Sequence, residues 1–498
     1  MAYNFMSADE AARLIKNGDV VATSGFTASG APKELPTAIA RYADEEHKAG
    51  REFQISLFSG ASTGDSCDGE LSRAHAMKFR TPYQSSKDLR KAINSGEVNY
   101  IDAHLSQLAQ ELRYGTYGKI NVAILEAADL SANGDILLTA GVGNSATYAN
   151  LAEKIIVEIN DMHPKSILGI HDIYEPADPP YRKEIPIYSV KDRIGKETLK
   201  VDPEKIIAVV NTSRPNEVGK FTPVDETTQK IGENVAKFLS SQLKCGFIPK
   251  SFLPIQSGVG NVANAVLGLL GDDPDIPNFT MYTEVIQDAV IDLMKKGRVS
   301  FASGSSLTVT EETLRDVYGN LDAFRDKLIL RPIEISNNPE VVRRLGLITL
   351  NTALEADIYG NINSTHVMGT KMMNGIGGSG DFTRNAYISV YSCPSIQKGG
   401  CISPIVPMVS HVDHSEHSVK VLITDQGIAD LRGLAPRERA KCIIENCVHP
   451  DYKQLMWDYL KLTDSKLQTP HNLRAAFAFH NAFNETGDMR NIDWSKYE

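Results

Sequence analysis

Residues 256–288, QSGVGNVANAVLGLLGDDPDIPNFTMYTEVIQD, decide the fold that we predict for this chain. An apolar run (247–255) leads into a glycine turn, and apolar residues then recur at helical spacing over 261–270. A second apolar run over 279–285 predicts another strand, with Glu284 near its carboxyl end. Strand, turn, helix and strand in this order are typical of a parallel sheet, and open α/β sheets bind ligands at the carboxyl ends of their strands.

The glycine turn has two functional interpretations. Residues 258–263 read GVGNVA, which fits the dinucleotide pattern G-x-G-x-x-A, and Glu284 follows at about the distance of a ribose-binding acid. Alternatively, Glu284 is a nucleophile, and the turn presents backbone N–H groups to an acyl oxygen. The plain structural alternative is a tight turn with Glu284 capping the next helix. The turn alone does not decide among these.

Length and charge limit the function classes. A chain of 498 residues predicts two or three domains. The net charge of -10 argues against general nucleic-acid binding and against a basic membrane-binding face. The six cysteines form no C-x-x-C pair, and they are expected to be reduced thiols in a cytoplasmic protein. The sequence shows no signal-peptide pattern and no run long enough to span a membrane.

Strands alternate with helices along the first 220 residues, which predicts an α/β domain with a parallel sheet. The expected strands are 20–24, 54–58, 121–126, 155–160 and 206–211.

A glycine loop, 25–32, precedes a helix predicted over 33–42, so it is either an ordinary strand–helix turn or an anion-facing loop. The stretch 214–225 is polar and carries two prolines. We therefore divide the chain into domains 1–220 and 221–498.

A second glycine-rich stretch, 375–380, reads GIGGSG, and its flanks are apolar. Glycine permits close approach of the backbone to a ligand, so we expect a rigid ligand-binding loop here. Three histidines in 411–417 invite a metal-site interpretation, but a polar turn that leads into a strand is favoured, and no metal is expected. Phosphate-loop and G-x-S-x-G motifs are absent from the sequence.

Four long motifs resemble one family. QSGVGNVANAVL, YTEVIQD, ALEADIYGNINSTHVMGTKMMNGIGGSGDF and PMVSHVDHSEHSVKVLITDQGIADLRGLAPRERA are similar to the acetyl-CoA hydrolase/transferase family. These proteins are class I CoA-transferases, including succinyl-CoA:acetate enzymes. The resemblance covers nearly the whole chain, and it favours the nucleophile interpretation of Glu284. It implies two open α/β domains of CoA-transferase type with the active site between them.

The resemblance also assigns roles to individual residues. Glu284 matches the glutamate that becomes a glutamyl-CoA thioester, and Gly378 matches a loop that completes an oxyanion hole. The residues expected to contact CoA are Gly258, Val259, Gly260, Asn261, Val262, Ala263, Asn374, Gly378 and Lys398. Asp425 stands where family members carry glutamate, so domain closure or acyl preference is expected to differ at this position.

The expected function is transfer of CoA between small carboxylates, acetate with succinate or propionate, by a ping-pong mechanism. The intermediates would be an acyl-glutamyl anhydride and a glutamyl-CoA thioester, with coenzyme A as a substrate and no cofactor. A homodimer is implied by the family. Acetyl-CoA hydrolysis by the same glutamate is the alternative. A nicotinamide-dependent dehydrogenase and a non-enzymatic acyl-CoA-binding protein are more remote ones.

Overall fold

The computed structural model describes residues 3–219 and 224–497 and divides into two compact units. Unit 1 comprises Met1–Lys220, Thr280–Leu345 and Asn374–Asp381, and unit 2 comprises Phe221–Phe279, Gly346–Met373 and Phe382–Glu498. The division predicted between residues 220 and 221 lies outside the described residues. Thr280–Leu345, which includes Glu284, and Asn374–Asp381 group with unit 1 and not with the rest of the predicted C-terminal domain.

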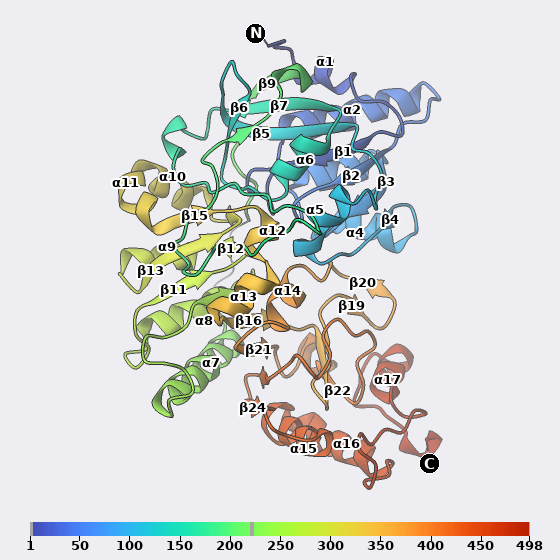
Figure 1. Cartoon of the computed structure of the whole chain (residues 1–498). Helices are drawn as coiled ribbons and strands as arrows, with labels where there is room; N and C mark the ends of the chain where they lie inside the picture. Colours follow the sequence, from blue (N-terminus) through green and yellow to red (C-terminus); the bar gives the residue numbers. More distant parts are fainter. Residues whose placement is uncertain (1–2, 220–223, 498) are drawn as a thin grey trace. The chain divides into compact units, whose positions relative to one another are not determined.

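Unit 1 contains a large sheet whose strands follow the order β4-β3-β2-β1-β5-β6-β8, with β7 beside β5 and β9 beside β7 (Figure 1). Its strands are β1 (Val20–Thr23), β2 (Ile55–Phe58), β3 (Met77–Thr81), β4 (Asn99–Tyr100), β5 (Val122–Leu130), β6 (Asp135–Leu138), β7 (Lys154–Asn160), β8 (Leu199–Lys200) and β9 (Ile206–Thr212). The neighbours β1–β5, β5–β7 and β7–β9 are parallel, as predicted.

The helices of this part of unit 1 are α1 (Ala8–Ala12), α2 (Glu34–Lys48), α3 (Glu70–Arg73), α4 (Lys87–Asn94), α5 (Leu105–Arg113) and α6 (Ser145–Leu151). Ser7 and Glu10 form the capping box that begins α1. The apolar side chains of α1 and α2 pack with those of β1 and β2 in one buried core. Strands buried on both faces explain the nearly continuous apolar run of β5.

A second group of elements completes unit 1. Strands β11 (Phe279–Tyr282), β13 (Val299–Gly304) and β15 (Leu328–Leu330) are neighbours, and β12 (Val285–Ile286) pairs in parallel with β14 (Ser306–Leu307). The first residue of β11, Phe279, falls in unit 2. The helices are α9 (Asp288–Lys295), α10 (Glu311–Gly319), α11 (Leu321–Phe324), α12 (Ile333–Ser336) and α13 (Pro339–Leu345). The predicted strand 279–285 is thus interrupted at Thr283 and Glu284.

Unit 2 is also α/β. Its main strands follow the order β10 (Ile255–Ser257), β16 (Ile348–Thr352), β21 (Ile388–Ser392), β23 (Val421–Ile423) and β24 (Ile428–Asp430), and only β24 is antiparallel to its neighbour. The smaller strands are β17 (Glu355–Asp357), β18 (Ile362–Asn363), β19 (His366–Val367), β20 (Lys371–Met372) and β22 (Ile405–Val406). The helices are α7 (Glu226–Lys244), α8 (Asn261–Asp272), α15 (Pro436–Cys447), α16 (Pro450–Lys461) and α17 (Ala478–Thr486), and α14 (Ser379–Thr383) contains a unit boundary.

The apolar run 247–255 is not the strand that we expected. Only its last residue, Ile255, belongs to β10. Pro249 and Pro254 have no N–H group to donate to a sheet, and Phe252 adopts a positive φ of 59°. The prediction was wrong because it counted apolar residues and ignored the two prolines.

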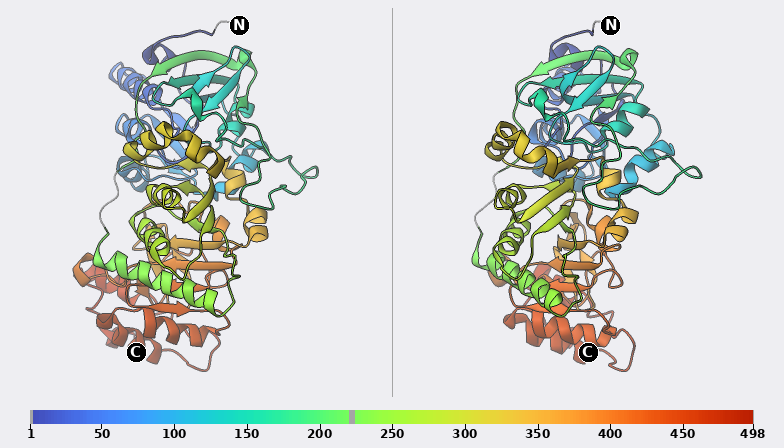
Figure 2. Two further views of the ribbon diagram at one scale, coloured as in Figure 1. Left: turned by 90° about the vertical axis from the view of Figure 1, so that its left-hand side faces the viewer. Right: turned by 60° about the vertical axis from the view of Figure 1, so that its left-hand side comes forward.

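The tip of the proline-rich stretch 172–188 extends away from the sheet (Figure 2). Tyr181 is 80% exposed. The stretch is nevertheless anchored, because Ile185 and Ile187 are buried and the Arg344 guanidinium donates to their carbonyl oxygens at 2.6 and 3.1 Å. Among the described residues, every helix is too short or too polar to cross a membrane.

Candidate active site

Glu284 occupies the short break between β11 and β12. Its carbonyl accepts the Ser305 N–H at 2.7 Å, and the preceding N–H, of Thr283, donates to Ser303 at 2.8 Å. The strand pairing of β12 with β14 then resumes at Val285. The backbone of Glu284 is therefore fixed on both sides, and its side chain is only 8% exposed.

The Glu284 carboxyl group has a polar neighbour, Asn337, directly after α12 and an acidic one, Asp381, directly after the second glycine loop. Asn337 donates from Nδ2 to Oε1 of Glu284 at 3.4 Å and to Oδ2 of Asp381 at 3.3 Å. Burial, and then the charge of Asp381, raise the pKa of Glu284 to about 8, while the Asn337 hydrogen bond acts to lower it. A desolvated carboxylate of this kind is more reactive than one surrounded by water.

The second glycine loop lies directly against Glu284. A β-carbon built on Gly378 would collide with Nδ2 of Asn337 and lie 2.7 Å from Oε1 of Glu284. Only glycine fits this position without displacing the carboxylate or the amide. The structure thus brings Gly378 and Glu284 together in unit 1, although 94 positions separate them in the sequence.

The rest of that loop is held by side chains of unit 1. The Ile376 N–H donates to both oxygens of Asp102 at 2.9 Å. A β-carbon on Gly375 would lie 2.6 Å from Oδ1 of Asp102 and 2.9 Å from the Tyr83 ring. The Asn374 amide donates from Nδ2 to the carbonyl of Gly375 at 2.9 Å. These contacts hold the backbone of the loop against side chains of unit 1, and its ligand-binding role stays a prediction.

Asn337 and Asp381 were missed as site residues. Asn337 follows α12, where Ser336 donates to its Oδ1 at 3.0 Å and so leaves Nδ2 directed at the two carboxyl groups. Asp381 accepts the N–H and the hydroxyl of Ser106 at 3.0 and 2.6 Å. A lone Asn and a lone Asp carry no local pattern, and only the fold brings them to Glu284.

The predicted CoA-contacting residues of the first glycine turn belong to unit 2. Gly260 is the N-cap of α8 with a φ of 119°, a conformation that favours glycine, and it offers no side-chain cap. Asn261, Val262 and Ala263 form the first turn of α8, as predicted. Backbone N–H groups at such a helix start attract anions. Val259 is 48% exposed beside them.

Lys398 and Asp425 also lie in unit 2. Lys398 is exposed, adopts a φ of 48°, and holds its Nζ 5.1 Å from the centre of the Phe483 ring. Asp425 accepts the N–H and the hydroxyl of Ser395 at 2.6 and 2.8 Å. The shorter acid at position 425 is thus committed to a local turn in this structure.

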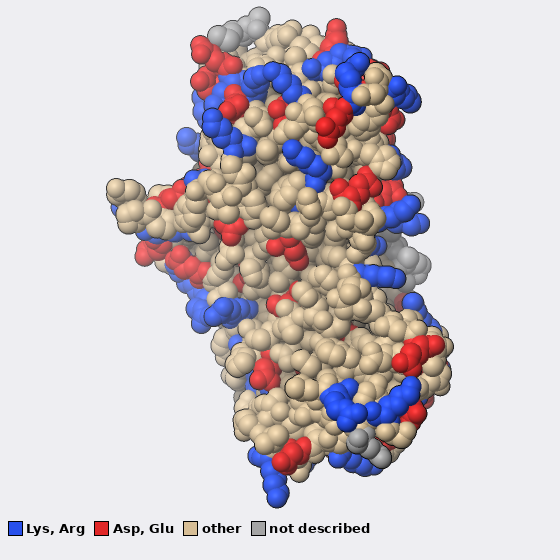
Figure 3. Space-filling model, turned by 90° about the vertical axis from the view of Figure 1, so that its right-hand side faces the viewer, with Lys and Arg blue, Asp and Glu red and all other residues tan. Residues whose placement is uncertain are grey.

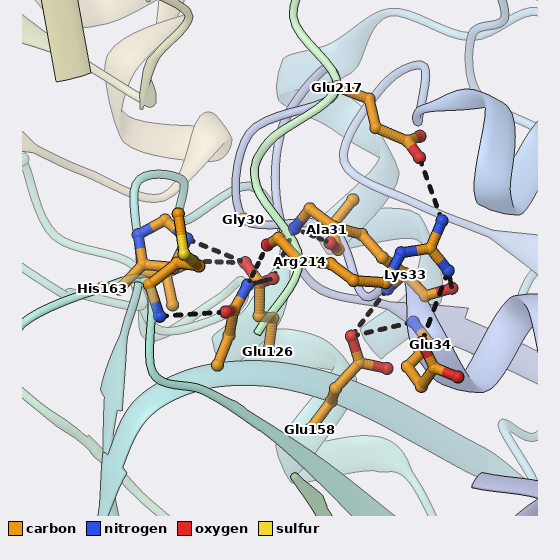
Figure 4. A network of polar contacts seen from close by, with 12 residues as sticks. Gly30, Ala31, Lys33, Glu34, Glu126, Glu158, His163, Arg214 and Glu217 are labelled. Atoms are coloured by element: carbon orange, nitrogen blue, oxygen red, sulfur yellow. Dashed lines mark hydrogen bonds and ion pairs between the residues drawn. The ribbon is translucent and has the colours of Figure 1, made fainter. Parts of the chain in front are cut away.

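The first-domain loop 25–32 is an ordinary strand–helix turn. Buried polar side chains support it from the side of the sheet (Figure 4). The carboxylate of Glu158 already accepts the backbone N–H groups at the start of α2, at 2.7, 3.1 and 2.8 Å. The buried ammonium of Lys33 pairs with Glu126 and also donates to a loop carbonyl at 2.8 Å. Because this helix start is occupied by a carboxylate of the chain itself, the structure favours the structural reading of the loop.

Family models match both halves of the chain. The acetyl-CoA hydrolase/transferase N-terminal domain matches residues 2–211, and the C-terminal domain matches residues 314–460. The chain belongs to the acetyl-CoA hydrolase/transferase family. The resemblance seen in the sequence is therefore confirmed.

Three members of this family show how similar the chain is to characterised relatives. It is 50% identical to the propanoyl-CoA:succinate CoA transferase of Escherichia coli (strain K12), over 97% of this chain and 98% of that protein. It is 49% identical to the succinyl-CoA:acetate CoA-transferase of Clostridium kluyveri, over 97% and 90%. It is 41% identical to an acetyl-CoA hydrolase of Candida glabrata, over 98% and 96%.

The fold agrees with this family assignment. A 4-hydroxybutyrate CoA-transferase from Porphyromonas gingivalis superposes with a TM-score of 0.63 at 19% identity, over 92% of this chain and 97% of that one. The predicted α/β fold of CoA-transferase type is confirmed. Among residues 3–219 and 224–497, no group of three or more His, Cys, Asp or Glu side chains is arranged to hold a metal ion.

Proposed function

We propose that this protein transfers CoA between small carboxylates, acetate with succinate or propionate. The observation that carries the proposal is the buried Glu284 carboxyl group packed against Gly378, in a position where no larger side chain fits. The names of the two relatives near 50% identity support the choice of carboxylates.

The proposed chemistry begins at Glu284. Its carboxylate oxygen attacks the thioester carbon, the carbon–sulfur bond breaks, and CoA leaves as a thiolate, which leaves an acyl-glutamyl anhydride. The thiolate then attacks the glutamyl carbonyl, the first carboxylate departs, and a glutamyl-CoA thioester remains. A second carboxylate reverses these steps. The backbone at Gly378 stabilises the oxyanion, and the energy of the thioester is kept throughout.

The remaining roles concern CoA. We place its contacts at Gly258 to Ala263, Asn374 and Lys398, with CoA as a substrate and no separate cofactor. The exposed ammonium of Lys398 and the α8 N-terminus are both suited to phosphate groups. A homodimer in the cytoplasm, without nucleic-acid or membrane partners, completes the proposal. Basic and acidic side chains are interspersed on the face drawn in Figure 3, and this mixed charge supports the proposal that nucleic acid is not a partner.

Transfer and hydrolysis share the same Glu284 thioester and differ in what attacks it. The relative named acetyl-CoA hydrolase makes hydrolysis the second candidate. Hydrolysis requires a base positioned to activate water. Asp381 is the acid beside Glu284, but its two oxygens already accept hydrogen bonds from Ser106 and Asn337. The structure therefore favours transfer.

Acetyl-CoA consumption is accordingly expected to be slow without an acceptor and to rise by about 10²-fold or more when succinate is added, the scale of a missing general base. Initial rates measured over a grid of both substrates should give the parallel lines of a ping-pong mechanism. The same assay with succinate omitted and with chloride at equal ionic strength is the control. An acceptor-independent rate equal to the rate with succinate would establish a hydrolase instead.

A further inference from the structure

Tyr83 lies beside the second glycine loop, in the part of unit 1 that contains Glu284. A β-carbon built on Gly375 or Gly377 would lie 2.9 or 3.6 Å from a carbon atom of the Tyr83 ring. The ring also packs against an apolar cluster that includes Val285, the residue directly after Glu284. The other members of this cluster are Phe26, Ala61, Leu105 and Ile333. Tyr83 therefore adjoins both segments that position the Glu284 carboxyl group, the start of β12 and the glycine loop.

The backbone that carries Tyr83 is held in place at the end of β3. The carbonyl of Pro82 accepts the Tyr100 hydroxyl at 3.1 Å and the Ala103 N–H at 3.3 Å. These two bonds link the residue before Tyr83 to the segment that follows β4. The direction in which the Tyr83 ring projects is thus fixed by unit 1 itself.

The Tyr83 hydroxyl is a donor that the protein does not use. Within residues 3–219 and 224–497 it makes no hydrogen bond. By contrast, the buried hydroxyls of Tyr148 and Tyr282 donate to backbone carbonyl groups at 2.6 and 2.5 Å. Burial, and then the negative charges of Glu284 and Asp102, raise the pKa of the Tyr83 phenol to about 12, so it keeps its proton at neutral pH. A half-buried O–H group of this kind is suited to a polar group of a ligand.

Each half of the proposed reaction brings a small carboxylate to Glu284. One oxygen of that carboxylate must approach the glutamyl carbonyl carbon, and the loss of its water shell is unfavourable unless a donor replaces the water. The Asn337 amide already lies between the carboxyl groups of Glu284 and Asp381. The Tyr83 hydroxyl is uncharged and lies on a ring packed against the glycine loop, so it can supply such a donor.

We propose that Tyr83 binds the small carboxylate: its hydroxyl donates a hydrogen bond to one oxygen of the acid while the other oxygen attacks the Glu284 thioester. This inference rests on the proposed function and adds a substrate-binding residue to it. As the new carbon–oxygen bond forms, the carbon–sulfur bond breaks and CoA leaves as a thiolate, and the phenol keeps its proton throughout. Acetate, propionate and succinate share the carboxylate that is bound, so Tyr83 contributes affinity for all three.

The kinetic test compares the wild type with Tyr83→Phe, which removes the hydroxyl and keeps the ring. Initial rates over a grid of acetyl-CoA with propionate or succinate give kcat and the KM of each acceptor. We expect the acceptor KM to rise about tenfold or more with little change in kcat, the scale of a lost hydrogen bond to a charged group. Tyr100→Phe is the matched control, because the Tyr100 hydroxyl also adjoins Gly375 but already donates to Pro82. Its acceptor KM is expected to stay at the wild-type value.

A single-turnover measurement isolates the step in which the carboxylate binds. Each protein is incubated with acetyl-CoA and freed of small molecules, and propionate is then added at a series of concentrations. Mass spectrometry follows the loss of the CoA adduct on the peptide that contains Glu284. We expect Tyr83→Phe to form the adduct and to need about tenfold more propionate than the wild type for the same rate of loss.

An unchanged acceptor KM in Tyr83→Phe, or an equal rise in Tyr100→Phe, would overturn the inference. A rise confined to succinate would place the phenol on the second carboxylate of that acid, and a fall in kcat alone would place it on the oxyanion. Either result would also overturn the inference as stated. A wild type without a CoA adduct would reject the proposed function, whereas an adduct with the same propionate dependence in both proteins would reject the role of Tyr83 alone.

Discussion

Glu284→Gln and Glu284→Ala are expected to lose CoA transfer by on the order of 10⁴-fold or more, the scale for removal of a covalent nucleophile. Glutamine is nearly isosteric and can still accept the Asn337 hydrogen bond at Oε1, so the pocket is preserved. Its amide nitrogen cannot attack a thioester to give an anhydride. Loss of rate in the glutamine variant would therefore report the chemistry of the carboxylate and not a collapsed site.

The measurement pairs kinetics with mass spectrometry of peptides from protein incubated with acyl-CoA. Wild type should carry a CoA adduct on the peptide that contains Glu284, and this adduct should disappear with hydroxylamine or with added acceptor carboxylate. Unaltered CoA binding by the variants, measured by calorimetry, is the control for folding. An adduct on another residue, or an alanine variant with wild-type turnover, would refute the role of Glu284.

Gly378→Val is expected to lower turnover by about 10²-fold or more, the scale of a lost oxyanion donor. The structure adds a second reason for this loss. A β-carbon at this position already collides with the Asn337 amide and lies 2.7 Å from Oε1 of Glu284, so valine must displace the nucleophile, its partner or the loop. Gly378→Ala should show a smaller loss in the same direction, because it adds the β-carbon without the two methyl groups.

The control for this substitution is Gly319→Val, at the end of α10. There the added β-carbon meets no other atom within 4 Å, and the φ angle is not positive. Circular dichroism and thermal unfolding of both variants establish that they are folded. Normal turnover in a folded Gly378→Val protein would show that the loop serves structure alone.

The sequence predicted the α/β elements wherever the local signals agreed. Strands such as β5 and β9 are largely buried apolar runs, and α8 begins after Gly260, in the glycine turn that follows β10. The error at 247–254 arose because the apolar composition of this run predicted a strand, whereas its two prolines lack the N–H groups that a strand needs for pairing. Family resemblance, not periodicity, separated a nucleophilic Glu284 from a ribose-binding one.

By itself, then, the sequence determined the fold class, the family and the two glycine loops, because these depend on patterns among neighbouring residues. Only the tertiary structure decided what surrounds Glu284. Asn337 and Asp381 lie 53 and 97 positions further along the chain than Glu284. Only chain folding brings the Asn337 amide within reach of the carboxyl groups of both Glu284 and Asp381. Burial is the largest cause of the raised pKa values of both acids, and burial is a property of the packed molecule that no short stretch of sequence contains.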